Sequence, residues 1–212
     1  MKIKWFGHAC FLMTSESGVS ILTDPFDEQV GYPLPEIHAD IVTTSHSHFD
    51  HNNTQIVKGD FKHVKNMGQF EEDGITITGI QTYHDEQKGG ERGINIIYKF
   101  DIDGINVCQV GDLGHILSEE QAELLQPVDV LLVPVGGTFT IDYKGAMQVK
   151  ELLSPSITIP MHYKTDALLF SLDTVNQFLS QYSNRDSFGK NEIEITNENL
   201  SSYPELVTLN YK

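Results

Sequence analysis

The sequence predicts an α+β fold in which two β-sheets pack against each other and helices cover the outside. β-rich runs fill the first half of the chain, helical and strand-like patterns alternate in the second half, and turn signals separate the runs. Two packed sheets with helices outside bury the apolar face of every one of these elements. A length of 212 residues suits one well-buried domain and is short for two, so we expect a single domain over residues 1–212.

Short β-rich runs make up the first part of the chain. We expect strands at residues 2–6, 9–14, 20–24, 39–45, 63–67 and 74–83. The plainest hairpin is GINIIYKFDIDGINVCQV, residues 93–110, because two strand-like runs meet across Asp103 and Gly104. Antiparallel pairing is therefore expected through most of this half.

Helical patterns begin at residues 118–125, where Ser118 is a candidate N-cap and Gln121 occupies the capping-box position. Further helices are expected at residues 145–154 and 172–182, and strands at residues 129–135, 156–160 and within the tail 191–212. The second half therefore alternates helices with short buried strands.

Composition and charge narrow the class of function. Hydrophobic residues make up 39% and charged residues 21% of the chain, which is ordinary for a globular protein. The formal net charge of −16 opposes contact with nucleic-acid phosphates and with anionic membranes, so we expect neither partner. Cys10 and Cys108 lie in apolar runs and are expected to be buried free thiols. With no signal-peptide or membrane-spanning pattern, these features predict a cytoplasmic protein.

Residues 45–51, SHSHFDH, crowd four metal-competent side chains into a short run. They are His46, His48, Asp50 and His51. Neutral imidazole and carboxylate are preferred ligands of zinc, manganese and iron, so a merely solvated polar loop explains the pattern poorly. In an extended segment His46 and His48 point to one side, whereas a following helical turn would direct Asp50 and His51 to a second spot nearby. One segment can therefore serve two ions.

Three further candidates follow apolar runs elsewhere in the chain. His84 comes after ITITGIQTY, Asp112 after INVCQV, and His162 after SITIP. Side chains at such positions leave the core for a shared rim, where functional residues gather. We therefore expect His84, Asp112 and His162 to complete the metal site begun by residues 45–51.

These motifs together resemble a known family. The segments SHSHFDH, QTYHDE, GDLGH and IPMHYKT are similar to those of the metallo-β-lactamase-fold superfamily of metal-dependent hydrolases. The opening WFGHACFLM and ILTDPF resemble a small single-domain branch, similar to the ascorbate-6-phosphate lactonase and N-acylphosphatidylethanolamine phospholipase D groups. The resemblance extends over residues 1–180 and implies a four-layer αββα sandwich, with metals at one edge between the two sheets.

The resemblance also implies an assignment of ligands. His46, His48 and His84 would bind one metal, Asp50, His51 and His162 would bind the other, and Asp112 would bridge both. Each ion then has three side chains and a share of one carboxylate, which leaves a position for water. The chain departs from the family pattern at Ser45, where threonine is usual, and at Phe49, where many members have a smaller residue. Neither change removes a ligand, and Phe49 predicts a narrower pocket.

Three residues are weaker candidates for the chemistry. His8 either lines the pocket or is a buried, hydrogen-bonded histidine. Asp24 is expected to orient a ligand histidine rather than to bind metal. His115, three residues after Asp112, is a candidate for substrate contact or proton transfer, and its alternative is a polar loop residue.

Substrate contacts are expected from Lys164 and Tyr163, which follow His162, and from Arg92 in the loop after His84. In a chain of charge −16, basic residues near the site must attract an anionic substrate locally. These residues therefore favour a small phosphorylated or carboxylated metabolite. The resemblance to the lactonase group agrees with this, and the resemblance to the phospholipase group favours a lipid instead.

The expected function is hydrolysis by a hydroxide that two divalent transition-metal ions activate. Zinc is favoured, and manganese or iron also suit nitrogen and oxygen ligands. Asp50 and Asp112 would serve in catalysis, with His8 and His115 as further candidates, on a lactone, an ester or a phosphodiester. The alternatives are a metal-binding regulatory module without catalysis and a nuclease, which the charge disfavours. No pattern in the sequence indicates an oligomeric state.

Overall fold

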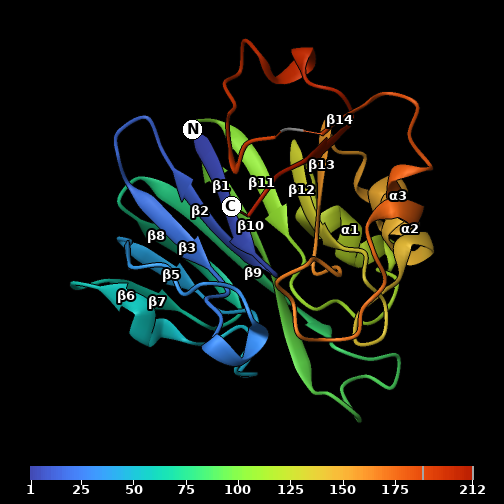
Figure 1. The fold of residues 1–212 in the computed structure, drawn as a ribbon. Helices are drawn as coiled ribbons and strands as arrows, with labels where there is room; N and C mark the ends of the chain where they lie inside the picture. The colour runs from blue at the N-terminus through green and yellow to red at the C-terminus, as the bar shows by residue number, and fades with distance from the viewer. Residues whose placement is uncertain (188, 212) are drawn as a thin grey trace.

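The computed structural model describes residues 1–187 and 189–211. Its strands form two large sheets that face each other, and its α-helices lie together on one side of the pair (Figure 1). This arrangement confirms the predicted α+β sandwich.

The first sheet has six strands in the order β15-β1-β2-β3-β5-β7. They are β1 (Lys2–Gly7), β2 (Cys10–Thr14), β3 (Ser20–Thr23), β5 (Ile41–Thr43), β7 (Lys62–Val64) and β15 (Glu192–Glu194). The first four strands of that order pair antiparallel, whereas β3, β5 and β7 run parallel. A separate two-stranded sheet joins β4 (Ile37–His38) to β6 (Val57–Lys58).

The second sheet has eight strands in the order β14-β16-β13-β12-β11-β10-β9-β8. They are β8 (Gly68–Glu72), β9 (Ile75–Tyr83), β10 (Ile94–Ile102), β11 (Ile105–Gln109), β12 (Val130–Pro134), β13 (Ile157–Met161), β14 (Arg185–Ser187) and β16 (Leu206–Thr208). The predicted hairpin is β10 and β11, which pair antiparallel across a turn at Asp103 and Gly104. Strands β11, β12 and β13 run parallel, so their carboxyl ends meet at one edge.

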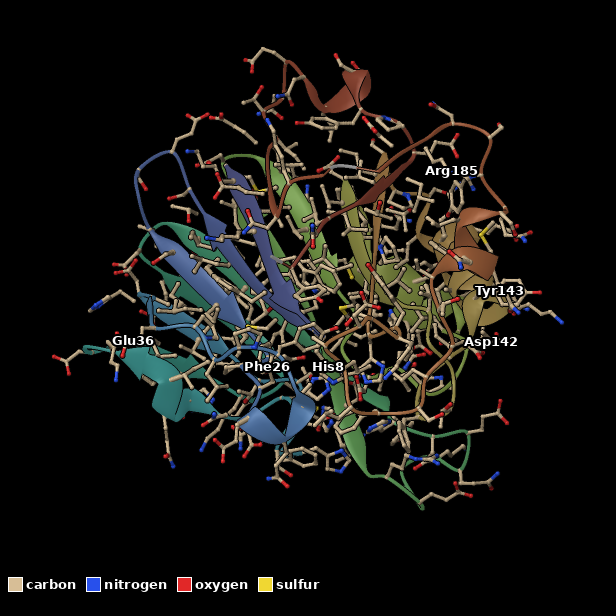
Figure 2. All side chains as sticks on the ribbon, viewed as in Figure 1. His8, Phe26, Glu36, Asp142, Tyr143 and Arg185 are labelled. Atoms are coloured by element: carbon tan, nitrogen blue, oxygen red, sulfur yellow. The ribbon has the colours of Figure 1, made fainter. Side chains whose placement is uncertain are left out.

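Helix α1 (Glu119–Leu125) begins with the predicted capping box of Ser118 and Gln121. Helix α2 (Tyr143–Leu153) begins after Asp142, whose side chain accepts from two backbone amides, and α3 (Asn176–Leu179) is short. Figure 2 shows Asp142 and Tyr143 beside the helices, whereas His8 lies near the lower ends of the strands.

Strand alternation places the core on both faces of the first sheet. Ile21 of β3 and Ile41 of β5 pack into the large core shared with the second sheet. Their neighbours Leu22 and Val42 pack into a second cluster on the opposite face. That outer face is covered by residues 26–39 and 167–172, including the 3₁₀ helix η1 (Glu28–Val30). A core shared by both sheets agrees with the single domain that we expect, which stays a prediction.

Two local expectations differ from the structure. The helix expected at residues 172–182 is limited to α3, because the backbone of Asp173 is used elsewhere: its N–H donates to Gly136 O and its carbonyl accepts from Lys164. Strand β8 was not expected, because GQFEE is polar and mostly exposed. It forms at the sheet edge through backbone pairing with β9.

Among the helices of the described residues, none is long and apolar enough to span a bilayer.

Candidate metal centre

The residues of the centre follow the ends of strands in both sheets. His84 comes directly after β9, Asp112 shortly after β11 and His162 directly after β13. The segment with His46 and His51 follows β5 of the other sheet. Because β9, β11 and β13 run in the same direction, their carboxyl ends present side chains at one edge of the sandwich.

The imidazoles of His46, His48 and His84 form one group. One nitrogen of each lies within 4.8 Å of the others, a spacing that one metal ion can bridge. Nε2 of His46 lies 3.0 Å from Nδ1 of His48. The structure thus brings together the three residues expected around the first ion.

A second group contains Asp50, His51 and His162, and His8 joins it. Nε2 of His8 donates to Oδ2 of Asp50 across 3.1 Å, and the His8 ring lies 4.1 Å from the His162 ring. The family resemblance assigns the first three residues to the second ion, and the sequence leaves the role of His8 open. The structure places His8 fully buried, in contact with this group.

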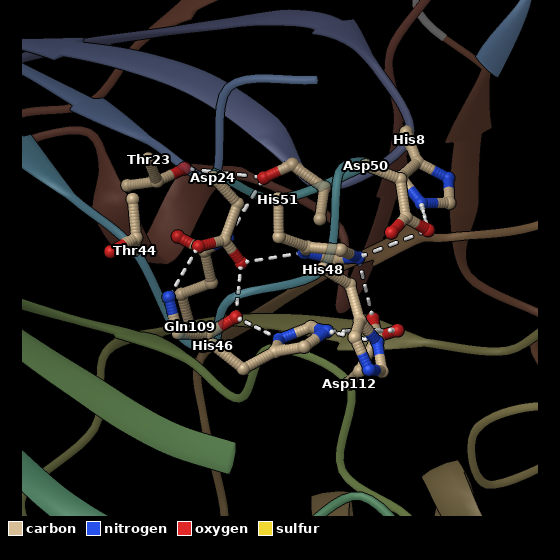
Figure 3. A network of polar contacts seen from close by, with 12 residues as sticks. His8, Thr23, Asp24, Thr44, His46, His48, Asp50, His51, Gln109 and Asp112 are labelled. Carbon is tan, nitrogen blue, oxygen red and sulfur yellow. Dashed lines mark hydrogen bonds and ion pairs between the residues drawn. The ribbon is translucent and has the colours of Figure 1, made fainter. Parts of the chain in front are cut away.

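The carboxylate of Asp112 lies between the two groups. Its Oδ2 is 3.2 Å from Nε2 of His84 and 3.3 Å from Nε2 of His162, whereas Oδ1 is 3.2 Å from Nε2 of His51. Asp112 is therefore in reach of imidazoles from both groups, as a bridging ligand must be (Figure 3).

The contact between His51 and Asp112 shows whether the centre suits a cation. Nδ1 of His51 lies 3.0 Å from Oδ2 of Asp24, and because a carboxylate only accepts, Nδ1 carries the proton. Nε2 then faces Oδ1 of Asp112 at 3.2 Å, and neither atom has a hydrogen-bond partner among the described residues. A ring nitrogen and a carboxylate oxygen this close need a positive charge at the contact, and a metal ion can supply it, so the donor set fits a metal ion.

The charge of the surrounding groups points the same way. Burial disfavours a charged His51, but the carboxylates of Asp112, Asp24 and Asp50 outweigh burial and raise its pKa well above the usual range. Burial alone would raise the pKa of Asp112, yet His162 and His51 hold that pKa well below its usual range. The centre therefore stabilises positive charge next to an ionised carboxylate.

Other histidines of the centre remain neutral. Burial, helped by His162, lowers the pKa of His8 to about 3. Burial, helped by His51, lowers the pKa of His46 to about 2. Neutral imidazole is the form that ligates metal, so His46 need not lose a proton to bind an ion near neutral pH.

Asp24 orders the histidine segment, as the sequence predicts. Its carboxylate accepts from the backbone N–H of Ser45 at 2.7 Å and from the Ser45 hydroxyl at 2.8 Å. Because that hydroxyl proton goes to Asp24, Ser45 Oγ accepts from Nδ1 of His46 at 2.9 Å. Asp24 thus directs Nε2 of both His46 and His51 into the centre.

Three residues of this region have a strained backbone. His8, Asp24 and His162 have φ angles of 53°, 40° and 50°, in the left-handed region that non-glycine residues rarely adopt. Such conformations persist only where the surrounding contacts hold them, and they gather at functional sites.

Asp112 is positioned by contacts that the sequence analysis missed. Its backbone N–H donates to Oδ1 of Asn95 at 2.9 Å, and the Asn95 amide donates in turn to Thr82 and to the Val110 carbonyl. Gly111 allows this approach, because a Cβ there would lie 2.4 Å from Oδ1 of Asn95. The available signal was an asparagine between Ile94 and Ile96 in a predicted strand.

A cavity of 370 Å³ opens above the centre. Phe49, Phe139 and Phe170 contribute its apolar walls, and Arg92 contributes a guanidinium group 5.9 Å from the ring of Phe139. Asp50, Asp112, His48 and His84 also line it. Arg92 is therefore placed where the sequence predicts a substrate contact, whereas the role of Phe170 had no local signal.

Three expected contacts are not made in this arrangement. His115 uses both ring nitrogens on backbone groups, Nδ1 on Ile116 O at 2.8 Å and Nε2 on Tyr83 N at 3.2 Å, so it fixes a loop instead of facing the centre. Tyr163 is buried against Trp5, with ring centroids 5.4 Å apart. The amino group of Lys164 contacts the carbonyls of Leu168 and Phe170. We therefore do not retain these three residues as substrate or proton-transfer groups.

The family model of the β-lactamase superfamily domain matches residues 2–162. The chain belongs to the β-lactamase superfamily. A relative from Archaeoglobus fulgidus is named a UPF0173 metal-dependent hydrolase and is 31% identical, with 80% of this chain and 86% of that protein covered. A second, from Carboxydothermus hydrogenoformans, has the same name and is 32% identical over 78% of this chain and 85% of its own.

One solved structure is of a Thermotoga maritima protein named as a Zn-dependent hydrolase of the metallo-β-lactamase superfamily. It is 41% identical to the present chain. Its TM-score is 0.83, and the match covers 98% of this chain and 97% of the other. These comparisons confirm the predicted fold and family. The chain is a metal-dependent hydrolase of the β-lactamase superfamily.

Proposed function

We propose that the chain uses two divalent ions to hydrolyse an ester-like bond of a small anionic metabolite. The bond would be a lactone, a carboxylic ester or a phosphodiester. The observation that carries this proposal is the position of Asp112, whose two oxygens face imidazoles of both histidine groups. A single carboxylate so placed can serve two ions at once.

The proposed ligands divide into two sets with one shared member. His46, His48 and His84 would hold one ion, Asp50, His51 and His162 would hold the other, and Asp112 would contribute an oxygen to each. Nitrogen and oxygen donors without a thiolate suit zinc, manganese or iron. Zinc is favoured because the Thermotoga maritima relative is named as Zn-dependent.

When bound, two such ions would lower the pKa of a water molecule and polarise the substrate oxygen. Asp24 fixes the outer nitrogens of His46, through Ser45, and of His51, so that Nε2 of each ring would be the atom to face a metal ion. The N–H of His8 donates to Oδ2 of Asp50, whose carboxylate lines the cavity. This hydrogen bond orients the carboxylate and helps to keep it ionised. No covalent nucleophile from the chain is needed for this reaction.

The cavity supports a small substrate with both apolar and anionic parts. Phe49, Phe139 and Phe170 offer apolar contact, and Arg92 offers the positive charge that a carboxylate or phosphate needs. The net charge of −16 makes this local charge important, because the rest of the surface repels anions. The buried free thiols Cys10 and Cys108 fit a reducing compartment, and we place the enzyme in the cytoplasm on that basis.

The test is a hydrolysis panel with natively purified protein and added zinc or manganese. We expect turnover of small lactones, carboxylic esters or phosphodiesters that carry an anionic group. Arg92→Gln should raise KM for the anionic substrate, and added salt should weaken substrate capture. Arg185→Gln is the matched control, since Arg185 lies far from His8 at the opposite end of the sandwich (Figure 2).

The same panel distinguishes the alternatives. Turnover of nucleic acid alone would indicate a nuclease. Stoichiometric metal without turnover of any substrate would indicate a metal-binding module. Good turnover of long-chain neutral esters, unaffected by Arg92→Gln or salt, would contradict the anionic substrate.

A further inference from the structure

A second hollow lies beside the metal centre, and two proposed ligands, His46 and His48, contribute to one of its walls. It is a groove of 710 Å³, larger than the cavity over the centre. One wall is the histidine segment at residues 44–48, and the other walls are residues 65–67 together with Gly93, Ile94 and Ile96. His48 and Arg92 line both hollows, so the groove and the cavity meet at the same two side chains.

The charge of the groove is opposite to that of the chain. The chain has 30 acidic and 14 basic residues, yet the described residues that line the groove include Lys65 and Arg92 and no carboxylate. Lys65 is exposed and has no ion-pair partner within 4 Å in the described part of the chain. The groove is therefore a place where an anion escapes the general repulsion of the surface.

The groove also has an apolar floor. Met67 is 54% exposed and Ile94 is 51% exposed, although both are large hydrophobic side chains. Both line the groove, next to the buried Ile96. Exposed apolar side chains grouped in a hollow are typical of ligand contact, and methionine adapts readily to different shapes.

We propose that this groove is a second subsite, which binds the anionic end of an extended substrate through Lys65 and its hydrocarbon part on Met67 and Ile94. This inference rests on the proposed function, because the scissile bond would lie at the metal centre on the far side of His48 and Arg92. The substrate class is then an ester-like acid in which a short apolar chain separates the reacting bond from a carboxylate or phosphate. A free anion without the chain would use only part of the site.

The test measures binding at Met67 directly and needs no turnover. The chain has 5 methionines, and labelling their methyl groups with carbon-13 gives one NMR signal each. Met1, Met13 and Met161 are buried, and Met67→Leu identifies the signal of the exposed Met67. Hexanoate and hexyl phosphate should shift this signal saturably, whereas the neutral hexanamide should shift it only weakly.

Lys65→Gln should weaken binding of both anions about two- to fivefold, the effect expected for one partly exposed ion pair. Lys58→Gln is the matched control, because Lys58 is exposed on β6 and does not line the groove. A response to hexanoate alone would assign the site to carboxylates, and a response to hexyl phosphate alone would assign it to phosphates. Equal shifts with hexanamide, no shift of Met67, or identical affinities in wild type and Lys65→Gln would each overturn the subsite.

The two proposals fail separately in this design. A protein that hydrolyses anionic esters but shows no response at Met67 retains the proposed function and loses the subsite. A protein in which Met67 responds as expected while no ester is hydrolysed retains the anion site and loses the proposed function.

Discussion

Oδ2 of Asp24 lies 3.0 Å from Nδ1 of His51 and thereby decides which nitrogen of that ring faces the metal centre. The same oxygen accepts the hydroxyl proton of Ser45, which leaves Ser45 Oγ to accept from His46. One carboxylate outside the proposed ligand set therefore controls the orientation of two proposed ligands.

Asp24→Asn should reduce metal affinity about 10- to 100-fold, the usual effect of losing a partner behind a ligand histidine. Asparagine tolerates the left-handed backbone at this position, so the loop should keep its shape. Its amide would present a donor to Ser45 or His51 and favour the wrong histidine tautomer. Metal titration of the chelator-treated protein measures the effect, and wild-type affinity in the variant would contradict the role of Asp24.

Wild-type protein should bind two divalent ions, and Asp112→Ala should lose most of both. Asp112 is the carboxylate that faces both histidine groups, so its removal affects both sites at once. His48→Ala should lose one ion only, because His48 belongs to one group. Elemental analysis after native purification gives the counts, and Asp101→Ala at an exposed position of β10 is the control. Full metal content and activity in Asp112→Ala would refute the bridging assignment.

Asp85→Asn should release two backbone amides of the loop that carries Arg92. Oδ1 of Asp85 accepts from the amides of Gln87 and Gly89, and Oδ2 accepts from those of Glu91 and Arg92. Asparagine keeps one acceptor oxygen, so one pair of amides should exchange hydrogen faster while the other pair stays protected. Asp85→Ala should release all four, and Asp60→Asn should release none. Unchanged protection in Asp85→Ala would contradict this role.

The contribution of Asp85 to stability should depend on pH in a defined direction. Burial opposes its ionisation, but the amides of residues 87–92 outweigh burial and lower the pKa of Asp85 to about 2. The folded pKa lies below the ordinary value of 3.8, so this stabilisation is complete above pH 3.8 and is lost as pH falls through about 2. The difference in unfolding free energy between chelator-treated wild type and Asp85→Ala should therefore be large at pH 5 and shrink toward pH 2. A difference that grew toward pH 2 would have the wrong sign.

Both thiols should be unreactive in the folded protein at pH 8. Cys10 and Cys108 are completely buried, and burial raises the pKa of Cys108 to about 12 and that of Cys10 well above its usual range. The thiolate is the reactive form, so a thiol reagent has neither access nor a reactive partner. Reaction with a chromogenic disulfide should require denaturant and should then report two thiols. Rapid native reaction would contradict the buried state.

Much of the centre was predictable, because its residues are local signals at the ends of apolar runs. His84, Asp112 and His162 each follow a strand directly or nearly so, and the structure brings them to His46 and His51. The capping box at Ser118 is likewise a contact within one turn. Such features depend on a few neighbouring residues, and a sequence shows them.

The cavity and its surroundings were less predictable, because they depend on contacts between distant segments. Phe170 reaches the cavity from a segment more than 100 residues away from Phe49, with ring centroids 6.0 Å apart. Tyr163 was misjudged for a geometric reason: His162 has a left-handed backbone, and the chain turns so that the next side chain packs on Trp5. Adjacency in sequence to a site residue therefore did not imply adjacency to substrate.

The proposed ligands come from opposite halves of the sandwich, and this has a mechanical consequence. His46, His48, Asp50 and His51 extend from the six-stranded sheet, whereas His84, Asp112 and His162 extend from the eight-stranded one. Ions coordinated by residues of both sheets would cross-link the sheets at one edge. Any sliding of one sheet over the other would then break coordination. Because metal then binds the folded chain and not its separated halves, melting temperature should climb with free metal concentration, and chelation should loosen this edge before the rest of the molecule.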